Sequence, residues 1–397
     1  MTKAAEEKEE GQVRAAPAPL AHDEPPAPVP VPADPAAPPA TRKRLPRVES
    51  LTGLRWWAAF FVFTHHMTNL APLPIYKFLK FGTSGVTFFF VLSGFVLTWS
   101  AQPGTKVRTF YRRRFARIWP AHAVALLAAV FVFYRIHPDP AMSWIKPFDI
   151  GILLLSVVLL HGWSNDPTIL YSGNPASWTL SVEAFFYAYF PFLQRATVRL
   201  KTAGGLVMCV VVVALGGAYR LALYKWPDTV PVLPQPVLHS VAFIFGIGLA
   251  IALRSGWRPR FPFWLAFAIF AVGIYTLYYS GEHRTVPFAT TMALTQKEIL
   301  TVLYGLMILA VASRDMRGGR SLLRSRPLVA LGQWSYSFYL VHATILYAIR
   351  EFHGLAGPVG WSNLTWYAGV LVLSIFASWL LYKFVEHPLE RRLRGPR

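Results

Sequence analysis

The chain has 397 residues, of which 54% are hydrophobic and only 15% are charged. This composition is too apolar for a protein whose whole surface faces water, so we expect an integral membrane protein embedded in the lipid bilayer. The net charge of +20 does not indicate nucleic acid binding, because the basic residues lie between apolar segments and not along one face. Cys209 is the only cysteine, which excludes an intramolecular disulfide and a CxxC metal site, and we expect no bound metal.

The first residues are acidic and then rich in proline and alanine, without the apolar core of a signal peptide. We expect residues 1–47 to be a disordered cytoplasmic tail. Residues 48–390 are predicted to form the transmembrane domain, and residues 391–397 a basic cytoplasmic tail.

Eleven apolar segments follow the first tail, and the fourth of them, residues 150–162, is the shortest. The segments cover residues 54–70, 85–100, 118–134, 150–162, 178–194, 204–222, 237–253, 261–280, 297–313, 328–349 and 364–383. As a helix, residues 150–162 would rise only about 20 Å, which is less than a hydrocarbon core of about 30 Å. We therefore expect this segment to be re-entrant or interfacial.

The distribution of basic residues supports this topology. If residues 150–162 do not span the membrane, one side carries 26 Lys and Arg residues in its loops and the other side carries nine. Cytoplasmic loops collect Lys and Arg. The sequence therefore predicts an all-α membrane protein with about ten transmembrane helices and both termini in the cytoplasm, most simply in a bacterial plasma membrane.

The first apolar segment, "LTGLRWWAAFFVFTHHM", contains one arginine and two histidines, and Thr52 is a suitable N-cap for a helix there. Arg55 and His66 are eleven residues apart, so a helix places them on one stripe with about 16 Å of rise between them. His65 points about 100° away from that stripe. Spacing therefore favours His66 over His65 as a functional residue, beyond the midplane from Arg55.

Two interpretations of this segment compete. Arg55 can snorkel to cytoplasmic headgroups while the histidines form interhelical hydrogen bonds. However, a histidine in the middle of a transmembrane helix is costly unless it faces the protein interior, so function is the default hypothesis for His66. Its imidazole can accept a proton near neutral pH, as an acyl-transfer base must.

The segment "FYRRRFARIWP" carries four arginines at the predicted entrance of the third helix. Arg112 and Arg113 are explained by anchoring at the cytoplasmic surface. Arg114 and Arg117 are three residues apart and share one face, where two guanidiniums can grip phosphate oxygens.

"SWTLSVEAFFYAYFP" places Glu183 within the fifth apolar segment. A carboxylate there has to be protonated, partnered or facing water, and a structural ion pair or hydrogen bond is the alternative to a catalytic role. Trp178 is either a substrate contact or an interfacial aromatic residue.

"LGQWSYSFYLVHATIL" places Ser335, Tyr336, Tyr339 and His342 on one broad face of the tenth segment. The hydroxyl groups can also serve interhelical hydrogen bonds. Counted along each helix, His66 and His342 both lie about 20 Å from the cytoplasmic side, and Glu183 comes out at a similar depth. We therefore expect these three residues to meet in one cavity.

At these residues the sequence resembles the membrane-bound acyltransferase family 3, whose members move acyl groups, commonly from acyl-CoA, to hydroxyls of sugars and other acceptors. The resemblance covers about residues 48–390. Five segments carry it in the family's order: "GLRWWAAFFVFTHH", "GVTFFFVLSGFVL", "RFARIWP", "WTLSVEAFFY" and "YSFYLVH".

The resemblance implies roles for the residues singled out above. His66 would be catalytic, as a general base or, less favoured, as a covalent acyl carrier, and Glu183 or His342 would hold its imidazole or bind the acceptor. The residues assigned to the phosphates of acyl-CoA are Arg55, Arg114 and Arg117, and those assigned to the acceptor are Trp178, Tyr336 and His342.

We therefore expect a membrane O-acyltransferase that uses acyl-CoA, most simply acetyl-CoA, as a donor substrate and holds no permanent cofactor. Its acceptor would be a hydroxyl of a sugar, a cell-envelope glycan or a glycosylated or secondary metabolite. The alternative is a proton-coupled transporter, which would move substrate without releasing CoA, but the sequence has no clear pair of related halves with broken helices.

Overall fold

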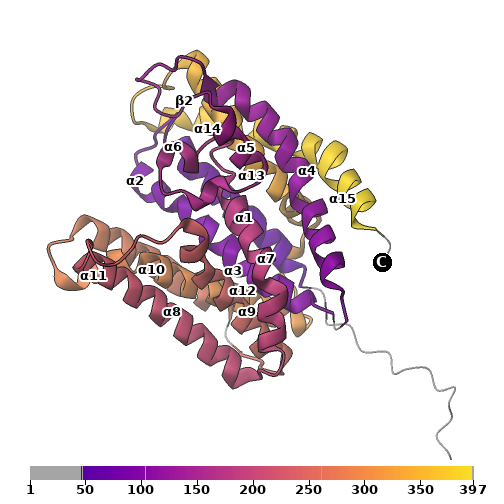
Figure 1. Cartoon of the computed structure of the whole chain (residues 1–397). Coiled ribbons are helices and arrows are strands. Elements are labelled where there is room, and N and C mark those ends of the chain that lie inside the picture. The colour runs from indigo at the N-terminus through magenta and orange to yellow at the C-terminus, as the bar shows by residue number, and fades with distance from the viewer. Residues whose placement is uncertain (1–45, 47, 103, 261, 396–397) are drawn as a thin grey trace, which may run out of the picture. The chain divides into compact units, whose positions relative to one another are not determined.

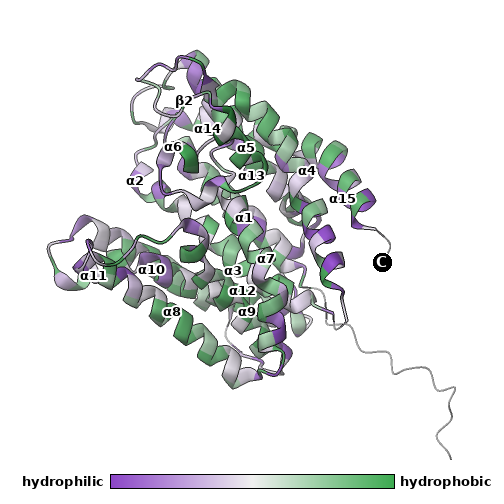
Figure 2. Ribbon diagram, in the orientation of Figure 1, coloured by the Kyte–Doolittle hydropathy of each residue, from purple (hydrophilic) through white to green (hydrophobic). Residues whose placement is uncertain are grey.

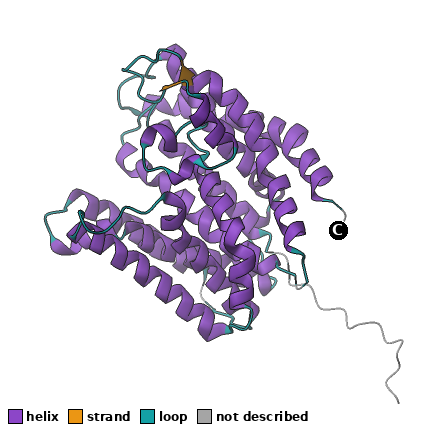
Figure 3. Cartoon of the chain, in the orientation of Figure 1, coloured by secondary structure: helices purple, strands orange, loops and turns teal. Residues whose placement is uncertain are grey.

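The computed structural model describes residue 46 and residues 48–395 except 103 and 261, so the predicted tail 1–47 lies almost entirely outside the described residues. Within this part of the chain, the only strands are β1 (Tyr134–Arg135) and β2 (Lys146–Pro147), which form one short parallel pair. All other regular structure is helical, as Figure 3 shows. The predicted all-α class is confirmed.

The helices fall into two groups, one before and one after residue 200. The first group is α1 (Ser50–Met67), α2 (Tyr76–Leu79), the 3-10 helix η1 (Lys80–Ser84), α3 (Gly85–Ser100), α4 (Val107–Phe133), α5 (Ile150–Val157), η2 (His161–Trp163), α6 (Pro167–Leu170) and α7 (Trp178–Thr197). The second group is α8 (Thr202–Lys225), α9 (Gln235–Arg254), α10 (Phe263–Glu282), α11 (Pro287–Leu294), α12 (Gln296–Met316), η3 (Leu322–Arg324), α13 (Arg326–His353), η4 (Trp361–Asn363), α14 (Leu364–Leu381), the π-helix η5 (Tyr382–Glu386) and α15 (His387–Arg394).

Seven helical stretches in the described part of the chain are long and apolar enough to cross a membrane. They are Tyr76–Ser100, Val107–Phe133, Thr202–Lys225, Gln235–Arg254, Phe263–Glu282, Gln296–Met316 and Trp361–Arg394. Figure 2 shows hydrophobic residues along most of their length. The protein is therefore a multi-pass membrane protein.

Three further helices, α1, α7 and α13, are 18, 20 and 28 residues long and fall outside this apolar set. Polar and ionisable residues such as Arg55, Glu183 and His342 lower the hydropathy of these helices. They carry all the predicted site residues except two arginines on α4. A topology of ten spanning helices with cytoplasmic termini stays a prediction.

The first long helix begins earlier than the predicted N-cap, Thr52, indicates. It starts at Ser50, whose backbone nitrogen and Oγ donate hydrogen bonds of 2.8 and 2.6 Å to the carboxylate of Asp315 at the end of α12. A carboxylate at this position satisfies the first N–H groups of α1 and interacts favourably with the helix dipole. The cap therefore comes from another helix, which the local sequence does not reveal.

The segment between α4 and α7 does not cross the bilayer. Helix α5 has eight residues and rises only about 12 Å, which agrees with the prediction for residues 150–162. The loop before α7 is folded into the protein, where Ser172, Asn174 and Ser177 have no exposed surface and Asn174 Nδ2 donates a 2.7 Å hydrogen bond to Leu340 O on α13. Helix α7 consequently begins inside the protein.

Helices α3 and α9 lie side by side in the core, with their backbones in direct contact (Figure 1). A Cβ atom on Gly94 of α3 would lie 2.0 Å from Phe243 O, and one on Gly246 of α9 would lie 2.0 Å from Val91 O. Small residues permit such close packing between membrane helices. This contact fixes α3, which carries Ser93 into the first cavity described below.

We expect Gly94→Ala to destabilise the protein by about 1–3 kcal/mol, because its methyl group overlaps the α9 backbone. The matched control is Gly369→Ala on α14, where a Cβ meets no atom within 4 Å. That control should be neutral or slightly stabilising, since alanine is the better helix former. Thermal unfolding of the two purified variants in detergent measures the difference, and equal midpoints would contradict the close α3–α9 packing.

Candidate active site

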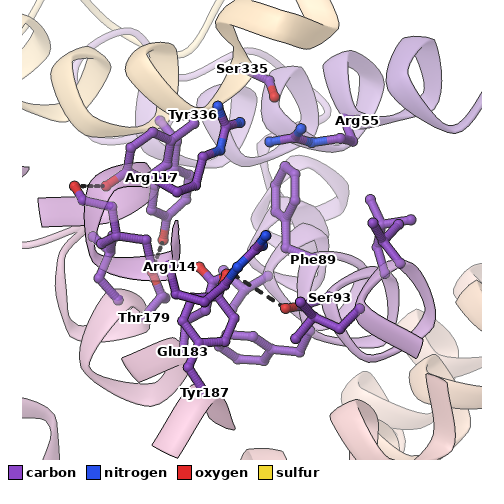
Figure 4. Close-up of a pocket in the computed structure, with 18 residues that line it drawn as sticks. Arg55, Phe89, Ser93, Arg114, Arg117, Thr179, Glu183, Tyr187, Ser335 and Tyr336 are labelled. Carbon is purple, nitrogen blue, oxygen red and sulfur yellow. Dashed lines mark hydrogen bonds between the residues drawn. The ribbon is translucent and has the colours of Figure 1, made fainter. Parts of the chain in front are cut away.

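A first cavity of about 220 Å³, which we call the arginine cavity, lies between α1, α3, α4, α7 and α13 (Figure 4). Its polar lining residues are Arg55, Ser93, Arg114, Arg117, Thr179, Glu183, Tyr187, Ser335, Tyr336 and Tyr339. The three arginines that the sequence analysis assigned to phosphate binding therefore meet in one place, although they come from two helices.

Arg117 is neutralised by two carboxylates. Its Nη1 lies 2.7 Å from Glu386 Oε1 and 2.9 Å from Glu390 Oε2. The Glu386 carboxylate is almost fully buried and also accepts a 2.6 Å hydrogen bond from Ser337 Oγ. Glu386 ends the π-helix η5, and such wide turns frequently occur at functional sites. The prediction that Arg117 binds phosphate thus meets a competing partner that the arginine spacing did not indicate.

Arg55 and Arg114 have no carboxylate partner within 4.0 Å among the described residues. Both guanidinium groups point into the cavity, from opposite sides, in Figure 4. The Arg114 guanidinium packs on the rings of Phe110 and Tyr187, at 5.8 and 5.7 Å from their centroids. Two uncompensated guanidiniums in a partly enclosed space are suited to bind an anion with several oxygen atoms.

Glu183 lines the same cavity as the arginines. Its Oε1 accepts hydrogen bonds from Ser93 Oγ at 3.3 Å and from the Tyr187 hydroxyl. The expectation that Glu183 meets His66 and His342 in one cavity is therefore wrong. The depth estimate started α7 at the membrane surface, whereas the helix begins inside the protein, so Glu183 lies deeper than the estimate placed it.

A second cavity of about 740 Å³, which we call the histidine cavity, lies next to the first. Its polar lining includes His65, His66, His239 and Lys297, and its aromatic lining includes Trp144, Tyr171, Trp178, Tyr339 and Tyr347. No Asp or Glu side chain lines it among the described residues. The two cavities share Val86 and Tyr339.

His66 and His342 form a pair, as their predicted depths indicated, with ring centroids 5.2 Å apart. His342 Nδ1 lies 3.1 Å from Phe338 O, so this nitrogen carries the proton and donates it to the carbonyl. In the neutral ring, His342 Nε2 then bears a lone pair. Among the described residues, this atom and His66 Nδ1 are buried without a hydrogen-bond partner.

The other predicted residues divide between the two cavities. His65, expected to point away, lines the histidine cavity with its ring 5.0 Å from that of His66. Trp178 lies there too, 5.5 Å from the ring of His239. Tyr336, assigned to the acceptor together with Trp178, instead lines the arginine cavity and donates a 2.8 Å hydrogen bond to Ile118 O.

Three residues of this region were not singled out in the sequence. His239 and Lys297 line the histidine cavity, and both lie inside or at the start of apolar segments, where an ionisable residue is itself a signal. Glu386 is the third, and it is buried at the end of the last apolar stretch.

The structure thus defines a class of protein: a multi-pass membrane protein whose helices enclose a cationic cavity beside a buried histidine pair. The family model described as "Acyltransferase domain", of the acyltransferase 3 type, matches residues 48–383. The chain belongs to this family and is a membrane acyltransferase that transfers groups other than aminoacyl groups.

Several named relatives are similar over most of the chain. Acyltransferase MdmB from Streptomyces mycarofaciens is 34% identical over 88% of this chain and 93% of its own length. The putative peptidoglycan O-acetyltransferase YrhL from Bacillus subtilis is 25% identical over 86% of this chain and 55% of its own. Peptidoglycan O-acetyltransferase OatA from Listeria monocytogenes is 23% identical over 88% and 57%. No solved structure matches the chain.

We expect Glu386→Gln to lower the stability of the protein by about 1.5–3 kcal/mol, because hydrogen bonds to charged groups have this worth and Glu386 is buried. Glu390→Gln is the matched control on the same arginine. Its side chain is 23% exposed, so the loss should stay below about 1 kcal/mol. Thermal unfolding in detergent compares them, and the reverse order would show that Glu386 does not anchor Arg117.

Proposed function

We propose that the protein is an O-acyltransferase that moves an acyl group, most simply acetyl, from acyl-CoA to a hydroxyl of a sugar, a glycan or a glycosylated metabolite. The observation that carries the proposal is the pair of uncompensated guanidiniums, Arg55 and Arg114, in a cavity beside the His66–His342 pair. The relatives whose names specify a reaction are O-acetyltransferases, two of them named for peptidoglycan.

The arginine cavity would receive the donor. Coenzyme A carries several phosphates, and charge-assisted hydrogen bonds from Arg55 and Arg114 are suited to hold them. In the predicted topology this side of α1 and α4 faces the cytoplasm, where acyl-CoA is available. The rise of about 16 Å from Arg55 to His66 is a distance that an extended pantetheine arm can bridge.

The histidine cavity would receive the acceptor. Trp178 and the other aromatic rings offer flat apolar faces for a sugar ring, and the unpartnered nitrogen atoms around the cavity offer hydrogen bonds to its hydroxyls. An acceptor in this cavity brings a hydroxyl next to His66.

The chemistry requires one base. His66 takes the proton of the acceptor hydroxyl while the hydroxyl oxygen attacks the thioester carbonyl. The C–S bond breaks, the ester forms, and the proton on His66 passes to the departing CoA thiolate. The neighbouring imidazole of His342 positions His66, because its ring packs against His66 and its own tautomer is held by Phe338 O.

Glu183 takes a role on the donor side in this proposal. Its hydrogen bonds to Ser93 and Tyr187 hold a negative charge close to Arg114, which packs on the Tyr187 ring. We propose that it keeps the arginine cavity formed when no donor is bound. The bacterial plasma membrane is the proposed location.

We expect His66→Ala to lower kcat by about 10²- to 10⁴-fold, the usual contribution of a general base. The measurement is CoA thiol release from acetyl-CoA in the presence of hydroxylated acceptors. His65→Ala is the neighbouring control and should lose much less, because His65 lacks the contact with His342. Full activity of the His66→Ala protein would remove His66 as the base.

We expect Arg55→Ala and Arg114→Ala each to raise KM for acyl-CoA by about 10- to 100-fold, the equivalent of one lost charge-assisted interaction. KM for the acceptor should not change. Arg112→Ala on the same helix as Arg114 is the control, because Arg112 is exposed and lines neither cavity. If all three variants bind acyl-CoA like the wild type, the arginine cavity is not the donor site.

A further inference from the structure

The two cavities are separated by four apolar side chains, which we call the neck. Val62, Ala176 and Tyr339 form a hydrophobic cluster of their own, and Val86 packs against it. They come from four different segments: α1, α3, the loop before α7 and α13. Val86 and Tyr339 line both cavities, whereas Val62 and Ala176 line only the histidine cavity.

The neck is held in place on the tyrosine side. The Tyr339 hydroxyl lies 3.1 Å from Thr179 Oγ1, within hydrogen-bonding distance, and Thr179 donates to Ala176 O at 3.0 Å. The Tyr339 ring also meets the ring of Phe89 edge-on, at 6.2 Å between centroids. These contacts fix the spacing between Tyr339 and Ala176, so the neck cannot widen without breaking them.

The neck opens directly at the histidine pair. The ring of His342 lies 5.8 Å from that of Tyr339, on the next turn of α13. On α1, Val62 precedes His66 by four residues, which is one helical turn. A thioester that reaches His66 from the arginine cavity therefore has its acyl carbon atoms beside the neck residues.

We propose that the neck determines which acyl chain the enzyme transfers, with Val86 and Ala176 as the residues that limit its length. This inference rests on the proposed function, because it requires the acyl-CoA arm to enter from the arginine cavity. The neck offers only apolar surface to the acyl group, and the two residues that limit it are small. A short chain fits between them, and each further methylene has to displace a side chain in a packed cluster.

The size of the effect follows from the value of one methylene in an apolar pocket, which is at least about tenfold in kcat/KM. Val86→Ala removes carbon atoms from the neck and should raise the ratio of kcat/KM for butyryl-CoA over acetyl-CoA by about tenfold or more. Ala176→Val adds carbon atoms and should lower the propionyl-CoA to acetyl-CoA ratio by a similar factor.

The experiment measures CoA release by the purified full-length chain with acetyl-, propionyl- and butyryl-CoA. Each ratio is taken within one preparation, so a loss of folded protein cancels. Val124→Ala is the control, because this valine lies on the exposed face of α4 and lines neither cavity. Its ratios should equal those of the wild type.

The outcomes separate the two proposals. Opposite shifts in Val86→Ala and Ala176→Val support the neck as the chain-length filter. Acetyl-CoA turnover with unchanged ratios in both variants overturns the neck and leaves the proposed function standing. A wild-type protein that releases CoA from none of the three donors overturns both.

Discussion

The cost of placing a charge inside a membrane organises this structure. An ionisable side chain there has to find an opposite charge or face a polar cavity. Arg117 follows the first course with Glu386 and Glu390, and Arg220 does so with Glu298, at 2.7 and 2.8 Å. Arg55 and Arg114 follow the second, which is why the arginine cavity is more than a gap between helices.

The long helices could be predicted from the sequence because lipid imposes a simple rule on them: a spanning helix needs a long apolar run. The ends of the helices obeyed no such local rule. The N-terminus of α1 is capped by Asp315, which is more than 260 residues away. The depth of α7 depends on a buried loop that Asn174 ties to α13. Neither contact leaves a periodic pattern in the sequence.

The same distinction explains the site. Spacing along one helix was reliable, since Arg114 and Arg117 line one cavity and His66 reaches His342. Comparison of depths between helices failed for Glu183, because it depended on where α7 begins. The position of His65 was also missed, because a cavity as wide as the histidine cavity exposes two neighbouring faces of α1 at once.

The division into two cavities suits a reaction with conflicting demands on water. Phosphates bind best where the guanidiniums that hold them stay partly hydrated, whereas a thioester next to a base is hydrolysed if water reaches it. A cationic cavity and a reactive histidine pair in one open space would meet only the first demand. An apolar neck between them lets the acyl arm pass and hinders water, so the separation of Glu183 and the arginines from His66 is a requirement of the chemistry and not an accident of packing.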